Sequence, residues 1–127
     1  MSKIVFDSSA LLALLNNEAG GEIVSSYKAQ AIISTVNLAE VNTILLNMGM
    51  KVAEISNLGS AIVKEVIPFD LSQALHSASL KQANKSFGLS MGDCACISLA
   101  EIKGLPVLTA DKIWKKANIK AEVILIR

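Results

Sequence analysis

The sequence predicts an α/β domain in which a parallel five-stranded sheet is covered by helices on both faces. Short apolar runs alternate along the chain with helix-forming segments, and these runs are continuous rather than interrupted by polar residues, which is typical of strands buried on both sides. Of the 127 residues, 52% are hydrophobic and 4% aromatic, so we expect one aliphatic core and a single domain over residues 1–127.

Five apolar runs are predicted to be strands. Each is rich in Ile, Val or Leu, and each is bounded by polar residues, by glycine or by a predicted helix. In order, the predicted strands are Ile4–Phe6, Ala31–Ile33, Val66–Phe69, Pro106–Leu108 and Glu122–Ile126.

Helices are predicted between and after these strands. Asp70 is a typical N-cap for the helix that follows it, and Gly104 is a typical residue at the end of a helix. The predicted helices are Ala10–Leu15, Glu22–Lys28, Thr35–Met48, Lys51–Val63, Leu71–Lys85, Ser90–Lys103 and Asp111–Lys116. In open parallel sheets ligands bind beyond the carboxyl ends of the strands, so functional residues are expected at that edge.

Composition and charge exclude several classes of protein. The formal net charge of +1 gives no bulk attraction to nucleic acid, so a polyanion would have to be held by local features. The longest uncharged run, Ala29–Ala39, is much shorter than the roughly 20 apolar residues that span a bilayer, and no membrane partner is expected. Cys94 and Cys96 point to different faces of a predicted helix, which suits neither a local disulfide nor a zinc pair and favours a reducing cytoplasm.

Four acidic residues are isolated from other charges. Asp7, Glu40 and Asp93 are each the only charged residue in a long segment, namely residues 4–17, 29–50 and 86–100. Asp111 ends the uncharged run 104–110. Surface carboxylates normally lie among lysines and other polar residues, so we expect these four to be at least partly buried.

The predicted elements bring the four acids to one rim of the sheet. Asp7 and Asp111 follow strands, and Glu40 and Asp93 lie in the first turns of helices that start at the same edge. A buried carboxylate without a partner either has a raised pKa or binds a cation. Four oxygen ligands suit Mg²⁺ or Mn²⁺, and with one histidine in the chain a zinc site is disfavoured.

Local roles for the same acids stay open. Asp7 and Asp111 could simply cap the helices that follow them. Ser90 and Asp93 have the spacing of a capping box, in which serine and acid exchange hydrogen bonds with the backbone. Glu40 has the weakest local explanation, because it lies within a helix rather than at its start.

Weaker signals surround the acids. Ser8, Ser9, Asn37 and Thr109 could orient carboxylates or water, or could be ordinary capping and turn residues. Four lysines near Asp111 could contact phosphates, although an exposed helix face is the preferred interpretation; they are Lys112, Lys115, Lys116 and Lys120. His76 is interpreted as a surface helix residue, and Cys94 and Cys96 as small core residues.

The segments around the acids resemble those of PIN domains. Residues 4–10, with Asp7, resemble the opening strand and first acid of that family, and residues 34–41, with Glu40, resemble its second acidic segment. Residues 89–97, with Asp93, resemble the third, and residues 107–111, ending in Asp111, the fourth. Each motif alone is weak, but the four in order are similar to the small bacterial and archaeal toxins of VapC type.

The resemblance implies a PIN-like three-layer sandwich with metal-dependent ribonuclease activity. It assigns catalytic and metal-binding roles to Asp7, Glu40, Asp93 and Asp111, with Mg²⁺ or Mn²⁺ as cofactor. It also implies a structured RNA substrate such as tRNA or rRNA, inhibition of translation, a VapB-type antitoxin and a homodimer. One departure is the scarcity of arginine, since Arg127 is the only one in the chain, so phosphate contacts would fall to lysines or backbone amides.

Two other classes of protein compete with the nuclease. One is a PIN scaffold without activity that binds RNA or protein. The other is a Mg²⁺-dependent receiver or phosphatase domain, which fits less well because the chain has neither paired acids before an acceptor nor the Asp-x-Asp motif at Asp7.

Overall fold

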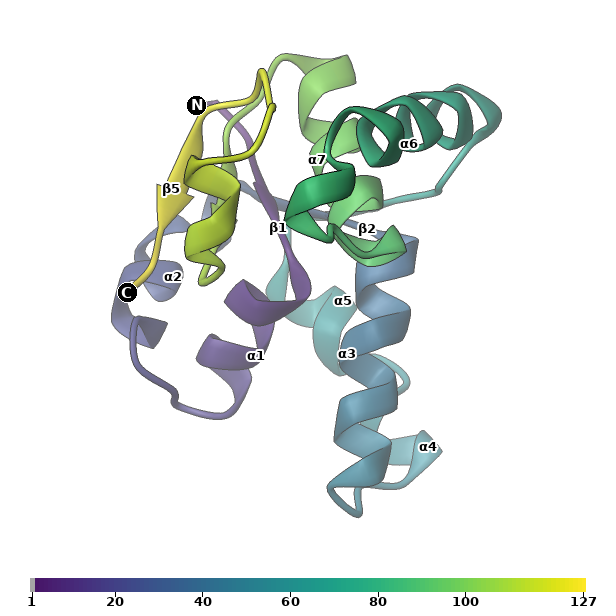
Figure 1. The fold of residues 1–127 in the computed structure, drawn as a ribbon. Helices are drawn as coiled ribbons and strands as arrows, with labels where there is room; N and C mark the ends of the chain where they lie inside the picture. The colour runs from purple at the N-terminus through teal and green to yellow at the C-terminus, as the bar shows by residue number, and fades with distance from the viewer. Residues whose placement is uncertain (1) are drawn as a thin grey trace.

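The computed structural model describes residues 2–127 and confirms the predicted α/β architecture. In this part of the chain five strands form one parallel sheet in the order β3-β2-β1-β4-β5 (Figure 1). The strands are β1 (Ile4–Phe6), β2 (Ala31–Ser34), β3 (Glu65–Ile67), β4 (Val107–Thr109) and β5 (Val123–Leu125). In the centre of the sheet Val5 pairs with Ile32 on one side and Val107 on the other.

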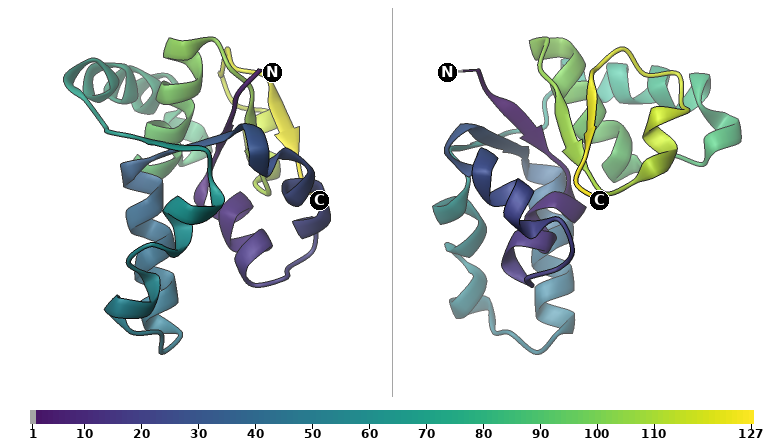
Figure 2. Two further views of the ribbon diagram at one scale, coloured as in Figure 1. Left: turned by 180° about the vertical axis from the view of Figure 1, so that it is seen from behind. Right: turned by 90° about the vertical axis from the view of Figure 1, so that its left-hand side faces the viewer.

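Helices cover both faces of the sheet, as the continuous apolar strands predict (Figure 2). One layer consists of α1 (Ser8–Leu15), α2 (Gly21–Tyr27), α3 (Thr35–Asn47), α4 (Val52–Ile55) and α5 (Leu58–Ile62). The other consists of α6 (Leu71–Ala83), α7 (Met91–Lys103) and the 3₁₀ turn η3 (Lys112–Lys115). Two further 3₁₀ turns are η1 (Lys28–Gln30) and η2 (Lys85–Phe87).

The core lies in two parts, one on each side of the sheet. Because successive strand residues point to opposite faces, Ile4 and Phe6 pack against the α1 to α5 layer, whereas Val5 packs against α6 and α7. The second part also contains Trp114, Cys94 and Cys96, which confirms the two cysteines as core residues.

Some predicted element boundaries are wrong. Residues 51–63 form two short helices instead of one, and at the break the Ser56 hydroxyl donates to the backbone oxygen of Ala53, which competes with the helical hydrogen bonds. The third strand ends at Ile67 because Pro68 has no N–H to continue the pairing. Residues 111–116 form only the short 3₁₀ turn η3. Within residues 2–127, none of the helices has both the length and the hydropathy that spanning a bilayer requires.

Candidate active site

The four isolated acids line a single cleft at the carboxyl ends of the strands. Asp7 directly follows β1, Asp111 lies two residues after β4, Glu40 lies on α3 and Asp93 in the first turn of α7. The cleft has a volume of about 270 Å³. Its lining is completed by Ser8, Ser9, Leu12, Asn37 and Ile44.

Asp7 is the most buried of the four acids, with a residue exposure of 6%. Its Oδ1 accepts hydrogen bonds from the backbone N–H of Ala10 (2.9 Å) and from Ser9 Oγ (2.7 Å), and its Oδ2 accepts one from Thr109 Oγ1. Burial raises the pKa of Asp7 from 3.8 to about 6, although these three bonds oppose the shift, and the charge of Asp93 raises it further. The predicted supporting roles of Ser9 and Thr109 therefore correspond to direct contacts with Asp7.

Glu40 is held by polar side chains from α1 and α3. Its Oε1 accepts hydrogen bonds from Ser8 Oγ (2.5 Å) and from Asn37 Nδ2 (3.0 Å). Asn37, which is buried, also donates from Nδ2 to the backbone oxygen of Gly92 at 3.0 Å, so it links α3 to α7. The carboxylate of Glu40 lies against Gly92 so closely that a Cβ on that residue would overlap it. The glycine at position 92 therefore makes room for Glu40. No sequence motif indicates this role.

Asp93 and Asp111 combine a capping role with their position in the cleft. Asp93 forms the predicted capping box with Ser90, and Asp111 accepts a hydrogen bond from the backbone N–H of Ile113. Burial raises the pKa of Asp93, and the charges of Asp111 and Glu40 raise it further. Asp93 is half-buried, whereas Asp111 is exposed, so the expectation that all four acids are at least partly buried is wrong for Asp111.

The potential metal ligands of the cleft fit a hard divalent cation, because they are carboxylate, hydroxyl and amide oxygens. Neither ion pair of residues 2–127 involves any of the four acids, so no lysine, arginine or histidine neutralises their charge there. In this part of the chain, however, no three carboxylate, imidazole or thiol groups stand close enough together to coordinate one ion directly. The arrangement suits Mg²⁺, which keeps several waters and binds to proteins through one or two carboxylates.

Three of the predicted lysines lie in or just after the turn that Asp111 begins. Lys112 and Lys115 belong to η3 and Lys116 follows it; all three are exposed, and none of them lines the cleft. Lys120 does not belong with them, because it lines a second cavity at the amino ends of β4 and β5.

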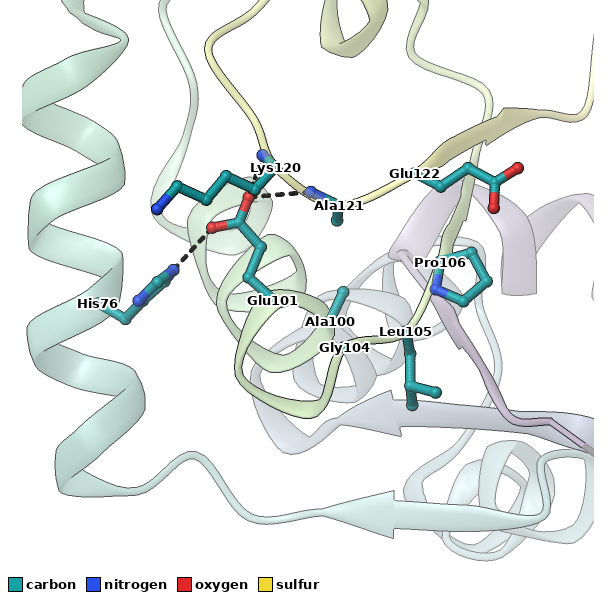
Figure 3. Close-up of a pocket in the computed structure, with 9 residues that line it drawn as sticks. All are labelled: His76, Ala100, Glu101, Gly104, Leu105, Pro106, Lys120, Ala121 and Glu122. Atoms are coloured by element: carbon teal, nitrogen blue, oxygen red, sulfur yellow. Dashed lines mark hydrogen bonds and ion pairs between the residues drawn. The ribbon is translucent and has the colours of Figure 1, made fainter.

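That second cavity, of about 370 Å³, is built around the carboxylate of Glu101 (Figure 3). The Glu101 side chain is 5% exposed, and its Oε1 lies 2.7 Å from His76 Nε2. Its Oε2 accepts hydrogen bonds from the backbone N–H groups of Lys120 and Ala121. His76, on α6, is therefore partly buried against Glu101 and is not the plain surface residue that the sequence predicts. No sequence motif indicated this contact.

The fold and the cleft together define a class of protein, a parallel α/β domain with carboxylates gathered at the carboxyl edge of its sheet. A protein-family model of the PIN domain matches residues 4–120. The chain therefore belongs to the PIN-domain family, as its four motifs predicted.

Solved structures support the same fold. A toxin–antitoxin complex from Klebsiella pneumoniae has a TM-score of 0.77 at 18% identity, and the match covers 98% of both chains. A VapC toxin from Mycobacterium tuberculosis, described as cleaving the sarcin-ricin loop, has a TM-score of 0.73 at 16% identity, covering 92% of this chain and 96% of that one.

A VapBC complex from Rickettsia felis bound to a DNA fragment from its promoter has a TM-score of 0.72 at 15% identity, covering 96% of this chain and 97% of that one. A comparison with curated proteins gives no match. At these identities the structures establish the shared fold, so activity has to be argued from the cleft.

Proposed function

We propose that this PIN domain is a Mg²⁺- or Mn²⁺-dependent endoribonuclease and the toxin of a VapBC-type toxin–antitoxin pair. The observation that carries the proposal is the convergence of Asp7, Glu40, Asp93 and Asp111 on one cleft. The raised pKa of Asp7 and of Asp93 supports it, because a cation in the cleft would offset the cost of burying these charges. Further support comes from structures of the same fold that are described as toxins, one of them cleaving the sarcin-ricin loop.

The residues of the cleft divide into two groups by their role. Asp7 and Asp93 would bind the cation directly, and Glu40 and Asp111 would hold its water ligands. A divalent ion bound there lowers the pKa of a water molecule and stabilises charge on the scissile phosphate. Hydrogen bonds from Ser9 and Thr109 keep Asp7 oriented, and those from Ser8 and Asn37 do the same for Glu40.

Hydrolysis of this kind leaves a 5′-phosphate and a 3′-hydroxyl on the RNA. An imidazole acid or base is not available in the cleft, because the only histidine of the sequence, His76, lies in the Glu101 cavity. The products therefore distinguish this reaction from a histidine-based ribonuclease, which forms a 2′,3′-cyclic phosphate.

The proposal extends to partners and substrate. We expect a structured RNA, tRNA or rRNA, whose cleavage inhibits translation, and a VapB-type antitoxin that blocks the cleft. A homodimer and a cytoplasmic location remain predictions of the family resemblance and of the two unpaired cysteines. We set aside the receiver and phosphatase alternatives because the chain belongs to the PIN-domain family.

The test is RNA cleavage by the purified protein with Mg²⁺ or Mn²⁺, compared with the same reaction in chelator. Asp7→Asn should lower the cleavage rate by about 100-fold or more, since it removes the carboxylate expected to bind the cation. The RNA ends, read by sequencing, should carry 5′-phosphates. Cleavage that persists in chelator or in Asp7→Asn would contradict the proposal.

Asp70→Asn is the matched control. Asp70 caps α6 through the N–H of Gln73 at 2.9 Å, as Asp7 caps α1 through the N–H of Ala10 at 2.9 Å, but Asp70 lies outside the cleft. If Asp7 were only a cap, the two variants would have the same activity. RNA binding without metal-dependent cleavage would instead support the alternative of a PIN scaffold without activity.

A further inference from the structure

A small cavity with lysine side chains lies on the α7 side of the acidic cleft. It has a volume of about 150 Å³ and is lined by Lys81, Asn84, Lys85, Gly88 and Leu89, which we call the lysine pocket. These lining residues include two cations and no carboxylate. Within residues 2–127, neither ion pair involves Lys81 or Lys85, so their charges are not neutralised there.

The lysine pocket adjoins the acidic cleft through the start of α7. Lys81 Nζ donates a hydrogen bond to the backbone oxygen of Leu89 at 2.6 Å. The next residue, Ser90, is the N-cap of α7 and exchanges hydrogen bonds with Asp93 of the cleft. The lysine pocket and a carboxylate of the cleft are therefore only four residues apart along the chain, at Leu89 and Asp93.

A buried asparagine fixes the lysine pocket beside the other group of lysines. Asn84 is 1% exposed; its Oδ1 accepts from the N–H of Asn118 at 2.6 Å, and its Nδ2 donates to the Asn118 oxygen at 3.1 Å. Asn118 follows η3, the yellow-green turn that carries Lys112 and Lys115 (Figure 1). The side chain of Asn84 thus ties the two lysine-bearing segments together.

The size and charge of the lysine pocket fit one kind of ligand group. Pockets that bind drug-sized molecules are usually about 300–1,000 Å³, so this one is too small for a nucleoside but suits a compact anion. Lysine ammonium groups are common partners of backbone phosphates.

We propose that the lysine pocket binds a backbone phosphate of the RNA next to the site of cleavage, an inference that rests on the proposed function. Lys85 is the principal contact, because Lys81 is already engaged by Leu89. Lys112, Lys115 and Lys116, which Asn84 ties to the lysine pocket through Asn118, then contact neighbouring phosphates of the same strand. Lysines of two segments would thus hold the RNA, which compensates for the single arginine in the chain.

The experiment measures RNA binding by an inactive protein. The dissociation constant of Asp7→Asn for labelled bulk tRNA is determined in chelator at several salt concentrations, with and without Lys85→Gln. Lys85→Gln should weaken binding by about threefold to tenfold at 0.1 M salt. It should also reduce the slope of log Kd against log salt by about 0.7 to 0.9, the value for one lost phosphate contact.

Lys103→Gln is the control, since it removes the same charge from an exposed lysine at the opposite end of α7. It should leave affinity and salt slope unchanged. Equal effects of the two substitutions, no effect of Lys85→Gln, or no RNA binding by Asp7→Asn would each overturn the inference. An unaffected RNA affinity together with weaker binding of the antitoxin would assign the pocket to a protein carboxylate instead.

Separate experiments test the proposed nuclease activity and the proposed phosphate site, so either proposal can fail without the other. Cleavage by the wild type with Mg²⁺ tests the nuclease, whereas binding by the inactive variant tests the lysine pocket. If the wild type does not cleave but Lys85→Gln still weakens binding with the smaller salt slope, the phosphate site stands and the nuclease falls.

Discussion

The two ends of the sheet each bury a carboxylate, but they treat it differently. At the amino ends, Glu101 is surrounded by the imidazole of His76 and two backbone N–H groups. At the carboxyl ends, Asp7 accepts hydrogen bonds from two hydroxyls and one N–H, and other acids lie close enough to raise its pKa and that of Asp93. The Glu101 cavity is larger, yet its carboxylate is already satisfied by the protein. The smaller cleft is the one where a cation would relieve an electrostatic cost, which is why we place function there.

The largest effect on stability should come from removing the Glu101 carboxylate, whose hydrogen bonds are all made within the protein. Glu101→Ala leaves two N–H groups and His76 without their acceptor, and unpaired buried groups are costly. We expect the free energy of unfolding to fall by about 3 kcal/mol. Urea denaturation, followed by circular dichroism, measures it.

Two further variants separate the contacts of Glu101 from its charge. Glu101→Gln keeps an acceptor for Lys120 and Ala121, so it should cost only about 1 kcal/mol. Glu122→Ala, which removes an exposed carboxylate from the same cavity, should stay within about 0.5 kcal/mol of the wild type. A loss in Glu101→Ala no larger than in Glu122→Ala would show that Glu101 does not hold α6 and the 118–121 segment together.

The pH dependence of stability should reveal the cost of burying the Asp7 carboxylate in the acidic cleft. The pKa of Asp7 is about 6 in the folded protein against 3.8 in its ordinary state, so between these pH values the folded state binds more protons than the unfolded state. The contribution of Asp7 to stability is therefore greatest below the lower pKa and falls as the pH rises towards the higher one. At about 1.4 kcal/mol for each tenfold change in proton affinity, the loss is up to about 3 kcal/mol.

Asp7→Asn isolates this effect. In chelator, the unfolding free energy of the wild type minus that of Asp7→Asn should decrease as the pH rises from about 4 to about 6. Mg²⁺ at neutral pH should recover part of the difference, because a ligand that binds only the folded state stabilises it. A difference that is constant with pH would mean that the Asp7 carboxylate is not desolvated in the folded protein.

The contrast between the two ends also explains what the sequence could predict. Asp7, Glu40 and Asp93 stand out because long uncharged segments surround each of them, and the alternation of strands and helices places such residues at one edge of the sheet. The fold class follows from the same periodicity. Both inferences use only local patterns and the general rule for parallel sheets.

Contacts between distant segments were not predictable in this way. Glu101 lies in the last turn of α7, two residues before Lys103, so no long uncharged segment on both sides marks it, and its partners are 25 and about 20 residues away in the sequence. The lysine pocket depends on the pairing of Asn84 with Asn118, which no motif marks. The prediction of a partly buried Asp111 rests on the uncharged run before it, but the lysines after it belong to a short 3₁₀ turn at the surface, and Asp111 is exposed with them.

The smallest expected effect tests how Glu40 is positioned in the cleft. Gly92 lies in α7, where a glycine costs roughly 0.5–1 kcal/mol relative to alanine. When the flexible Glu40 side chain moves away from the new methyl group, this helix gain is offset by the two hydrogen bonds that Glu40 loses, so Gly92→Ala should leave stability in chelator nearly unchanged. The moved carboxylate would lose its hydrogen bonds to Ser8 and Asn37, and Mg²⁺ affinity, measured by calorimetry, should fall about tenfold, or about 1.4 kcal/mol.

A double-mutant cycle decides whether Gly92→Ala acts through Glu40. In a Glu40→Gln background the carboxylate is already lost, so adding Gly92→Ala should change Mg²⁺ affinity little. Equal losses in both backgrounds would mean that the methyl group disturbs Asp93 or the start of α7 instead. Nearly unchanged stability combined with a loss of metal binding would distinguish the two ends of the sheet once more, because Glu101→Ala is expected to lower stability.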